Sequence, residues 1–427
     1  MKKIKFYYLA IFIAFSCSPP KVLLDNPGLS SLKKEINSLI IKSDLDINMS
    51  LKITSLESKK TLYALNSHKK LMPASNNKLY TSAAALVQLG ADYTFETSIY
   101  QNGTNIYLVG GGDPDFSLAS LDSLANIISS KIKTVDTLFV DESLMDTLHY
   151  GEGWMWDEGP WWYAAPVSAL SLNDNCVDFY YRPGKTGKPV QISTNPSTSY
   201  IKIDNQSFTV NDTIDFEKFK IERDWAGRTN SFKISGKIMK FNSADTLIRN
   251  IVHPPLFAGT VLKEMLTKNG TSVENVLIGQ VSNNSKFLTS HFSDSLFYSA
   301  KNLMNESDNL TAELFIKTLG ISNDAPGNWK SGLNIVKSFL ADSAKIDTTT
   351  IRIVDGSGVS RYNLTSADHF IDLLTYMYQS PYNNDFLKIL PHGGSKGTLN
   401  NRIKTNGERI RAKTGHLSGV SCLSGYA

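Results

Sequence analysis

Cysteine is scarce in this chain, and histidine is sparse and scattered. The 427 residues include only three cysteines and seven histidines. No group of His, Cys and carboxylate residues has the spacing of a metal site, so the sequence predicts neither a bound metal nor a cofactor. A disulfide between Cys176 and Cys422 is possible in an oxidising compartment, but nothing in their spacing demands it.

Strong net charge and long apolar runs are missing as well. The formal net charge is +4, and Lys2, Lys3 and Lys5 lie in the first few residues. Without that segment the chain is close to neutral, which removes electrostatic support for nucleic-acid binding. Beyond the N-terminus no apolar run is long enough to span a bilayer. The composition, with 41% hydrophobic and 20% charged residues, is that of a globular protein, and the length predicts two or three domains.

The N-terminus has the pattern of a secretory signal. Three lysines precede an apolar core from Phe6 to Phe15, and Ser16-Cys17-Ser18-Pro19 follows. We interpret residues 1–17 as a signal peptide with a lipobox, although Phe15 departs from the small residue usual there. The alternative is ordinary signal-peptidase cleavage, with Cys17 lost or left as a free thiol. The first interpretation predicts a lipid anchor at Cys17 and a location in the periplasm or cell envelope.

Three short motifs supply the parts of an acyl-transfer site that works without histidine. They are Ser75-Asn76-Asn77-Lys78, Ser307-Asp308-Asn309 and Lys413-Thr414-Gly415. A serine and a lysine three residues apart share one face of a helix. The helix that begins near Ser75 also stabilises negative charge beside it. A purely structural interpretation, in which Ser75 only caps the helix, is available as well.

Each motif has rivals elsewhere in the chain. Other S-x-x-K pairs exist, but only Ser75 begins an apolar helix rich in small residues. Lys185-Thr186-Gly187 repeats the third motif, yet prolines surround it, and proline does not fit a central strand. Ser282-Asn283-Asn284 repeats the second motif, but no helix follows it, whereas we expect Ser307 to open one. We therefore assign the site to Ser75, Ser307 and Lys413.

The region between the first two motifs is longer than one compact catalytic domain needs. We predict that residues 93–241 form an insertion, which proteins tolerate at surface loops. Within it, residues 150–163 carry four tryptophans together with Asp157 and Glu158. We favour a hydrophobic core of the inserted region for this aromatic segment. The alternative is an aromatic wall beside the active-site cleft, with an acid that meets a substrate amine.

Further segments match one family together with the three motifs. The chain resembles the class C low-molecular-mass penicillin-binding proteins, which are D-alanyl-D-alanine carboxypeptidase/endopeptidases. The additional matching segments are Gly110-Gly111-Gly112-Asp113-Pro114, Ala164-Ala165-Pro166-Val167-Ser168-Ala169-Leu170, Leu310-Thr311-Ala312-Glu313, Asp355-Gly356-Ser357-Gly358 and Gly397-Thr398-Leu399. Asp308 stands where the family more often has asparagine.

The resemblance implies a mixed α/β (α+β) fold. We expect a penicillin-recognising domain, of the serine transpeptidase and β-lactamase type, interrupted by mainly-β inserted domains. Residues 25–92 and 242–427 would form the catalytic domain, and residues 93–241 the inserted domains. In the family the chain continues past Lys-Thr-Gly through further strands and a closing helix, so we expect the second catalytic segment to be truncated.

The resemblance also implies a function, a serine-type D-Ala-D-Ala carboxypeptidase/endopeptidase that acts on peptidoglycan stem peptides and is acylated by β-lactams. Ser75 would be the nucleophile. Its general base would be Lys78, with a pKa lowered by burial and by the charge of Lys413. The remaining roles would be proton relay (Ser307), orientation of Lys78 and the substrate amide (Asn309), carboxylate binding (Lys413, Thr414, Gly415) and a backbone oxyanion hole (Ser75 and His416).

Two alternatives remain open at this point. A β-lactamase or esterase could use the same constellation, but it needs efficient deacylation, and we cannot place the glutamate that class A enzymes use for it. The second alternative is a non-catalytic, wall-binding lipoprotein that retains the fold as a receptor. Release of D-alanine from a pentapeptide separates an enzyme from such a receptor.

Overall fold

The computed structural model describes residues 31–427 except 156, 215 and 323. The predicted signal peptide and its lipobox, residues 1–17 with Cys17, lie outside the described residues. In the part of the chain that is described, no helix is long and apolar enough to cross a membrane. The chain divides into two compact units, with the boundary between Lys69 and Lys70.

The first unit contains a helix and a β-hairpin. These are α1 (Ser31–Lys42), β1 (Leu51–Thr54) and β2 (Thr61–Leu65). The strands are antiparallel, with Leu51 opposite Leu65. The Tyr63 hydroxyl donates a 2.8 Å hydrogen bond to Asn37 Oδ1 of α1, so one polar contact ties the helix to the hairpin.

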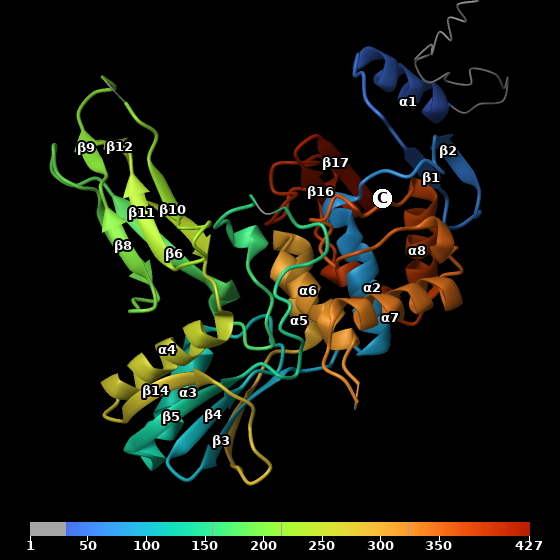
Figure 1. Cartoon of the computed structure of the whole chain (residues 1–427). Coiled ribbons are helices and arrows are strands. Elements are labelled where there is room, and N and C mark those ends of the chain that lie inside the picture. Colours follow the sequence, from blue (N-terminus) through green and yellow to red (C-terminus); the bar gives the residue numbers. More distant parts are fainter. Residues whose placement is uncertain (1–30, 156, 215, 323) are drawn as a thin grey trace, which may run out of the picture. The chain divides into compact units, whose positions relative to one another are not determined.

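A mixed five-stranded sheet forms the first part of the second unit (Figure 1). Its strand order is β14-β5-β4-β3-β15, and helices α3 and α4 contact each other and the sheet. Apolar residues recur in its strands, so that Ile99, Leu108 and Val140 are fully buried in one core. The bounds are β3 (Glu96–Asn102), β4 (Asn105–Val109), α3 (Leu118–Lys131), β5 (Thr134–Asp141), α4 (Pro254–Lys268), β14 (Ser272–Ile278) and β15 (Lys286–Phe292).

Short β-strands make up the region between β5 and α4. They form small sheets with the orders β13-β6-β7, β10-β11-β8 and β12-β9. Phe179 and Phe232, from two of these sheets, pack with their ring centres 4.8 Å apart. The bounds are β6 (Cys176–Arg182), β7 (Gln191–Asn195), β8 (Lys202–Asn205), β9 (Phe208–Val210), β10 (Lys220–Arg223), β11 (Ser231–Ser235), β12 (Lys237–Met239) and β13 (Asp245–Asn250).

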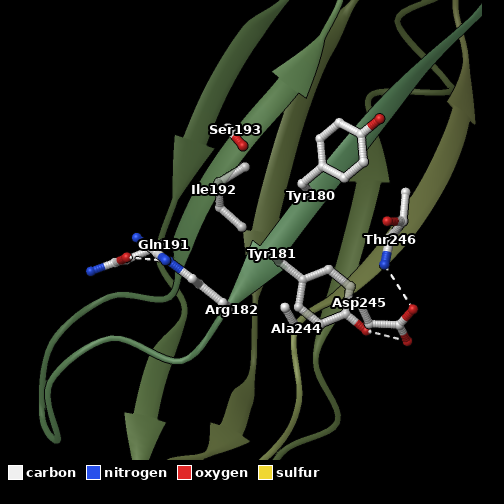
Figure 2. Close-up of a pocket in the computed structure, with 9 residues that line it drawn as sticks. All are labelled: Tyr180, Tyr181, Arg182, Gln191, Ile192, Ser193, Ala244, Asp245 and Thr246. Carbon is white, nitrogen blue, oxygen red and sulfur yellow. Dashed lines mark hydrogen bonds between the residues drawn. The ribbon is translucent and has the colours of Figure 1, made fainter.

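A pocket of about 420 Å³ opens on the sheet β13-β6-β7 (Figure 2). Polar side chains that line it bond to one another: Arg182 Nε donates to Gln191 Oε1 over 2.7 Å, and the Tyr181 hydroxyl donates to Asp245 Oδ2 over 3.2 Å. None of its lining residues belongs to the three motifs. The pocket is therefore a feature of this β region and separate from the predicted catalytic group.

Helices dominate the rest of the second unit and enclose its other apolar core. The central helix α2 is buried along most of its length, and Ala83, Ala84 and Ala85 allow α6 and α7 to pack close to it. The bounds are η1 (Ala74–Asn77), α2 (Lys78–Gln88), α5 (Leu296–Glu306), α6 (Asn309–Leu319), α7 (Trp329–Asp342), α8 (Ala367–Gln379), α9 (Asn383–Ile389), β16 (Arg411–Leu417) and β17 (Val420–Tyr426); shorter 3₁₀ turns are η2 (Trp162–Ala164), η3 (Asn173–Asn175), η4 (Thr348–Thr350) and η5 (Gly407–Arg409).

Strand pairing crosses the predicted end of the insertion. The sequence predicts an end at residue 241, but β13 pairs with β6, β14 with β5, and β15 with β3. Strands that pair with the predicted insertion therefore continue to Phe292. Mainly-β structure describes only the middle part of this region, because α3 and α4 pack on the five-stranded sheet.

The disulfide that the sequence leaves possible is not formed, since Cys176 and Cys422 are both free.

Candidate active site

The first motif lies where a 3₁₀ turn becomes a helix. Pro73 leads into η1, and Ala74 adopts a φ of 45°, a region that residues with a Cβ rarely occupy. Ser75 follows in η1, and Lys78 begins α2. Lys78 Nζ lies 3.0 Å from Ser75 Oγ. The serine and lysine therefore share one face, as their spacing predicts.

Lys78 is fully buried, and its amine has three oxygen neighbours. Besides Ser75 Oγ, these are Asn309 Oδ1 at 2.6 Å and the Ser357 carbonyl at 2.9 Å. Burial lowers the pKa of Lys78 to about 8, although nearby Asp308, Glu313 and Asp355 act to raise it. A neutral amine has two hydrogens and one lone pair. If Asn309 and Ser357 accept the two hydrogens, the lone pair faces the Ser75 hydroxyl.

The second motif connects two helices. Ser307 adopts a φ of 63° and caps the end of α5, so it lies in a turn and does not open a helix as predicted. Asp308 is the N-cap of α6, and its carboxylate accepts hydrogen bonds from the Leu310 and Thr311 backbone. This left-handed turn places Ser307 and Asn309 on the same site from different helix ends.

Asn309 contacts protein groups through both ends of its amide. Its Oδ1 accepts from Lys78, and its Nδ2 donates a 2.8 Å hydrogen bond to the Tyr163 carbonyl. The expected orientation of Lys78 agrees with the first contact. The Tyr163 carbonyl takes one of the two Nδ2 hydrogens, and the expected contact of Asn309 with a substrate amide stays a prediction.

Lys413 lies in the middle of β16 and is fully buried. Its Nζ donates to Ser307 Oγ over 2.9 Å and to the Thr414 carbonyl over 2.8 Å. Burial, followed by the charge of Lys78, holds the pKa of Lys413 well below its usual range. The sequence predicts that burial and the charge of Lys413 lower the pKa of Lys78; in the structure burial is the main cause, and the repulsion between the two lysines appears in the lowered pKa of Lys413.

Strand β16 passes very close to η1, and Gly415 makes this possible. A Cβ at Gly415 would lie 2.7 Å from the Pro73 carbonyl oxygen and 3.1 Å from the Ser75 nitrogen. Only glycine fits such an approach without movement of the backbone. On either side of it, Thr414 is buried and His416 is exposed. The strand edge beside Ser75 thus contains the residues predicted for carboxylate binding and for the oxyanion hole.

The rival motifs lie elsewhere in the fold. Lys185 is exposed in the β region, where the Gly187 amide donates to the Thr209 carbonyl. Ser282 lies in an exposed loop and contacts Asn102 and Ser285. Within the described part of the chain, neither is hydrogen-bonded to the five residues that the structure brings together: Ser75, Lys78, Ser307, Asn309 and Lys413.

The aromatic segment differs from its favoured interpretation. Trp161 and Trp162 are 43% and 42% exposed, so a core of the inserted region is wrong for both. Trp154 instead donates from Nε1 to Asp355 Oδ2 over 3.1 Å, and the Tyr163 carbonyl contacts Asn309. Trp154 and Tyr163 therefore lie beside the catalytic group, as the alternative of an aromatic wall requires.

Sequence reasoning missed the buried carboxylates beneath Lys78. Glu313 and Asp355 are fully buried and influence the pKa of this lysine. Both lie in segments that match the family, Leu310-Thr311-Ala312-Glu313 and Asp355-Gly356-Ser357-Gly358, but the sequence alone assigns neither carboxylate a role. Among the residues that the structure describes, no group of His, Cys, Asp or Glu side chains is arranged to hold a metal ion.

Comparison with known proteins gives a consistent result. Residues 32–427 match the family described as D-Ala-D-Ala carboxypeptidase 3 (S13). A D-alanyl-D-alanine carboxypeptidase of Actinomadura sp. (strain R39) is 30% identical, over 96% of this chain and 80% of that protein. The D-alanyl-D-alanine carboxypeptidase DacB of Haemophilus influenzae is 25% identical, over 83% of this chain and 77% of that protein.

Solved structures show the same fold. The crystal structure of penicillin binding protein 4 (dacB) from Haemophilus influenzae is similar with a TM-score of 0.77 and 22% identity, covering 88% of this chain and 86% of that one. A complex of the same protein with a β-lactam gives a TM-score of 0.73 at 22% identity, covering 91% and 88%. The predicted fold class, a penicillin-recognising α/β fold with inserted domains, is confirmed.

Proposed function

Because this chain belongs to the D-Ala-D-Ala carboxypeptidase 3 (S13) family, we propose that it hydrolyses D-alanyl-D-alanine-containing stem peptides of peptidoglycan through an acyl-enzyme on Ser75. The observation that carries this proposal is the surroundings of Lys78. Its amine lies 3.0 Å from Ser75 Oγ, with two further oxygen acceptors within 2.9 Å. A deprotonated Lys78 in that position is a general base for the serine hydroxyl.

Acylation begins when Ser75 Oγ attacks the carbonyl carbon of the penultimate D-alanine. The hydroxyl proton moves to Lys78 Nζ as the new C–O bond forms. The backbone N–H groups of Ser75 and His416 stabilise the oxyanion. The C–N bond then breaks as the leaving amine takes a proton from the Ser307 hydroxyl, which Lys413 Nζ, 2.9 Å away, reprotonates. The proton held on Lys78 passes to Lys413, so that both lysines return to their starting states before deacylation.

Deacylation releases the shortened peptide. A water molecule attacks the ester carbonyl, a proton leaves the water for Lys78, and Ser75 Oγ is reprotonated as the C–O bond breaks. A β-lactam would acylate Ser75 by the same first step, because its amide carbonyl takes the place of the peptide carbonyl. The positive charge of Lys413 and the Thr414 side chain would hold the carboxylate of either ligand.

Covalent labelling tests the nucleophile. A fluorescent penicillin should label the wild-type protein, and Ser75→Ala should abolish the label. Ser282→Ala, a change in the rival motif, is the matched control and should leave labelling unchanged. Persistent labelling of the Ser75→Ala protein would refute the assignment.

Product analysis tests the reaction. Release of D-alanine from a pentapeptide demonstrates carboxypeptidase activity, and mass analysis of digested sacculi shows whether cross-links are also cut. A labelled protein that released neither product would be a receptor and not a hydrolase. Rapid turnover of nitrocefin would favour a β-lactamase.

We also propose an envelope location with a lipid anchor at Cys17. The support is the sequence pattern alone, with Lys2, Lys3 and Lys5 before an apolar core, together with a substrate that lies outside the cytoplasm. Metabolic labelling with a fatty acid should mark the wild-type protein but not Cys17→Ser. Equal labelling of both would exclude this anchor.

A further inference from the structure

A buried turn, residues 355–357, contacts Lys78 and its neighbours in η1 and α2. Three successive carbonyls of the turn accept hydrogen bonds from the end of η1 and the first turn of α2. The Asp355 carbonyl accepts from Asn77 Nδ2 (2.7 Å), the Gly356 carbonyl from Thr81 Oγ1 (2.7 Å) and the Ser357 carbonyl from Lys78 Nζ (2.9 Å). The backbone of residues 355–357 therefore determines where one of the acceptors of Lys78 lies.

The opposite side of the turn rests on two carboxylates. Glu313 of α6 accepts from the Gly356 amide through Oε2 and from the Ser357 amide through Oε1, each over 2.8 Å. Its Oε2 also accepts from Trp329 Nε1 of α7 over 2.8 Å. Asp355 accepts from the amides of Gly358 and Ser360 and from two side chains, Asn363 and Trp154.

Close packing leaves this turn little freedom. A Cβ at Gly356 would lie 2.6 Å from the Ala312 carbonyl oxygen, and one at Gly358 would lie 1.9 Å from the Ala74 carbonyl oxygen. The turn is thus wedged between α6 and the η1 turn that contains the nucleophile. A shift of Ser357 would move the acceptor that orients the lysine.

We propose that Glu313 is a positioning residue for the acylation step, which acts by fixing the Ser357 carbonyl against Lys78 Nζ and by placing a negative charge near that amine. The proposal rests on the function proposed above. The hydrogen bonds of Glu313 come from Trp329 and from the Gly356 and Ser357 amides and not from Ser75, so its effect reaches the reaction through Lys78. Asp355 supports the same turn from its other end.

The charges around Lys78 come from several elements. Asp308 and Glu313 belong to the α5–α6 turn and α6, Asp355 to the buried turn, and Lys413 to β16. The charge of Lys317, also on α6, interacts with that of Glu313, but its amine donates a hydrogen bond to Asp146. Burial raises the pKa of Glu313 and Asp355; however, their oxygens face N–H donors, a geometry that fits the ionised carboxylates.

A change from Glu313 to glutamine tests both parts of the proposal. It removes the charge, and its NH₂ group cannot accept from a backbone amide. We expect the plateau rate of penicillin acylation to fall roughly tenfold or more, as for loss of a buried hydrogen bond to a charged group. The acidic limb of the pH–rate profile should move to lower pH by about one unit, because an anion no longer raises the pKa of Lys78.

Glu313→Asp separates position from charge. It keeps the anion but draws the carboxylate back, so the plateau should fall while the acidic limb stays close to that of the wild-type enzyme. The control is Glu274→Gln on β14, an exposed carboxylate, which should change neither quantity. This aspartate variant also serves as the test if the glutamine variant does not fold.

The possible results are distinct. If Glu313 had only a structural role, its loss would lower the amount of folded protein, but the acidic limb of the pH–rate profile of the folded protein would stay in place. An unmoved acidic limb in a folded Glu313→Gln protein would therefore overturn the proposal. An unchanged plateau in Glu313→Asp would do the same. Failure of the proposed function itself shows differently, as absence of Ser75 labelling in the wild-type protein.

Discussion

Replacing Lys413 tests most directly how a buried positive charge contributes to acylation. Its ammonium group is fully buried and bonds to Ser307 Oγ and the Thr414 carbonyl. Lys413→Met removes the charge while filling much of the volume, and Lys413→Ala also removes the bulk. Comparison of the two separates loss of charge from loss of packing.

The expected magnitude follows from the contacts that are lost. A hydrogen bond from a charged donor is worth about 1.5–3 kcal/mol, so loss of the contact to Ser307 alone corresponds to roughly 10- to 150-fold in rate. Loss of the charge that binds the ligand carboxylate adds to this. We expect both variants to acylate roughly 10²–10³ times more slowly, the scale seen for removal of one main electrostatic contributor.

The assay is the second-order rate of labelling by a fluorescent penicillin, with thermal unfolding as a check on folding. Lys185→Ala is the matched control, because it alters the exposed Lys-Thr-Gly of the β region. It should acylate at the wild-type rate. Equal rates for Lys185→Ala and a folded Lys413→Met, or a larger loss for Lys185→Ala, would refute the assignment of the third motif.

Two further predictions concern the same site. Burial brings the pKa of Lys78 to about 8, and only the neutral amine accepts a proton. The acylation rate should therefore rise as the pH passes through that value. A rate that stays flat between about pH 6 and pH 9 would contradict the assignment of Lys78 as general base. Gly415→Ala places a methyl group 2.7 Å from the Pro73 carbonyl oxygen, so we expect a loss of about 1–3 kcal/mol in the free energy of unfolding together with slower acylation, measured by urea unfolding and by penicillin labelling. Wild-type values for both would show that η1 and β16 are farther apart.

Local spacing explains what could be predicted from the sequence. Ser75 and Lys78 are three residues apart, so helix geometry alone places them together. Lys413 was distinguished from Lys185 by its neighbours, because prolines do not fit a central strand. Both signals lie within short stretches of the chain, so they can be recognised in a single sequence.

Other parts of the site depend on contacts that have no local signature. The acceptors of Lys78 and Asn309 include backbone carbonyls of Ser357 and Tyr163, and a carbonyl is present at every residue. The strand pairs that cross residue 241 lack a local signature for a similar reason. Strand β15 pairs with β3, and no pattern within residues 286–292 shows which earlier strand it joins.

The long separations within the catalytic group have a consequence for how the protein folds. The hydrogen bonds of Lys78 to Asn309 and to Ser357 span 231 and 279 residues. Such distant contacts carry a larger loop-closure entropy than local ones, so we expect them to form after hairpins such as β3–β4 and β16–β17. Until then the charges of Lys78 and Glu313 remain hydrated. Reactivity toward penicillin therefore reports the completed tertiary structure, and recovery of labelling after dilution from denaturant should lag behind recovery of secondary structure.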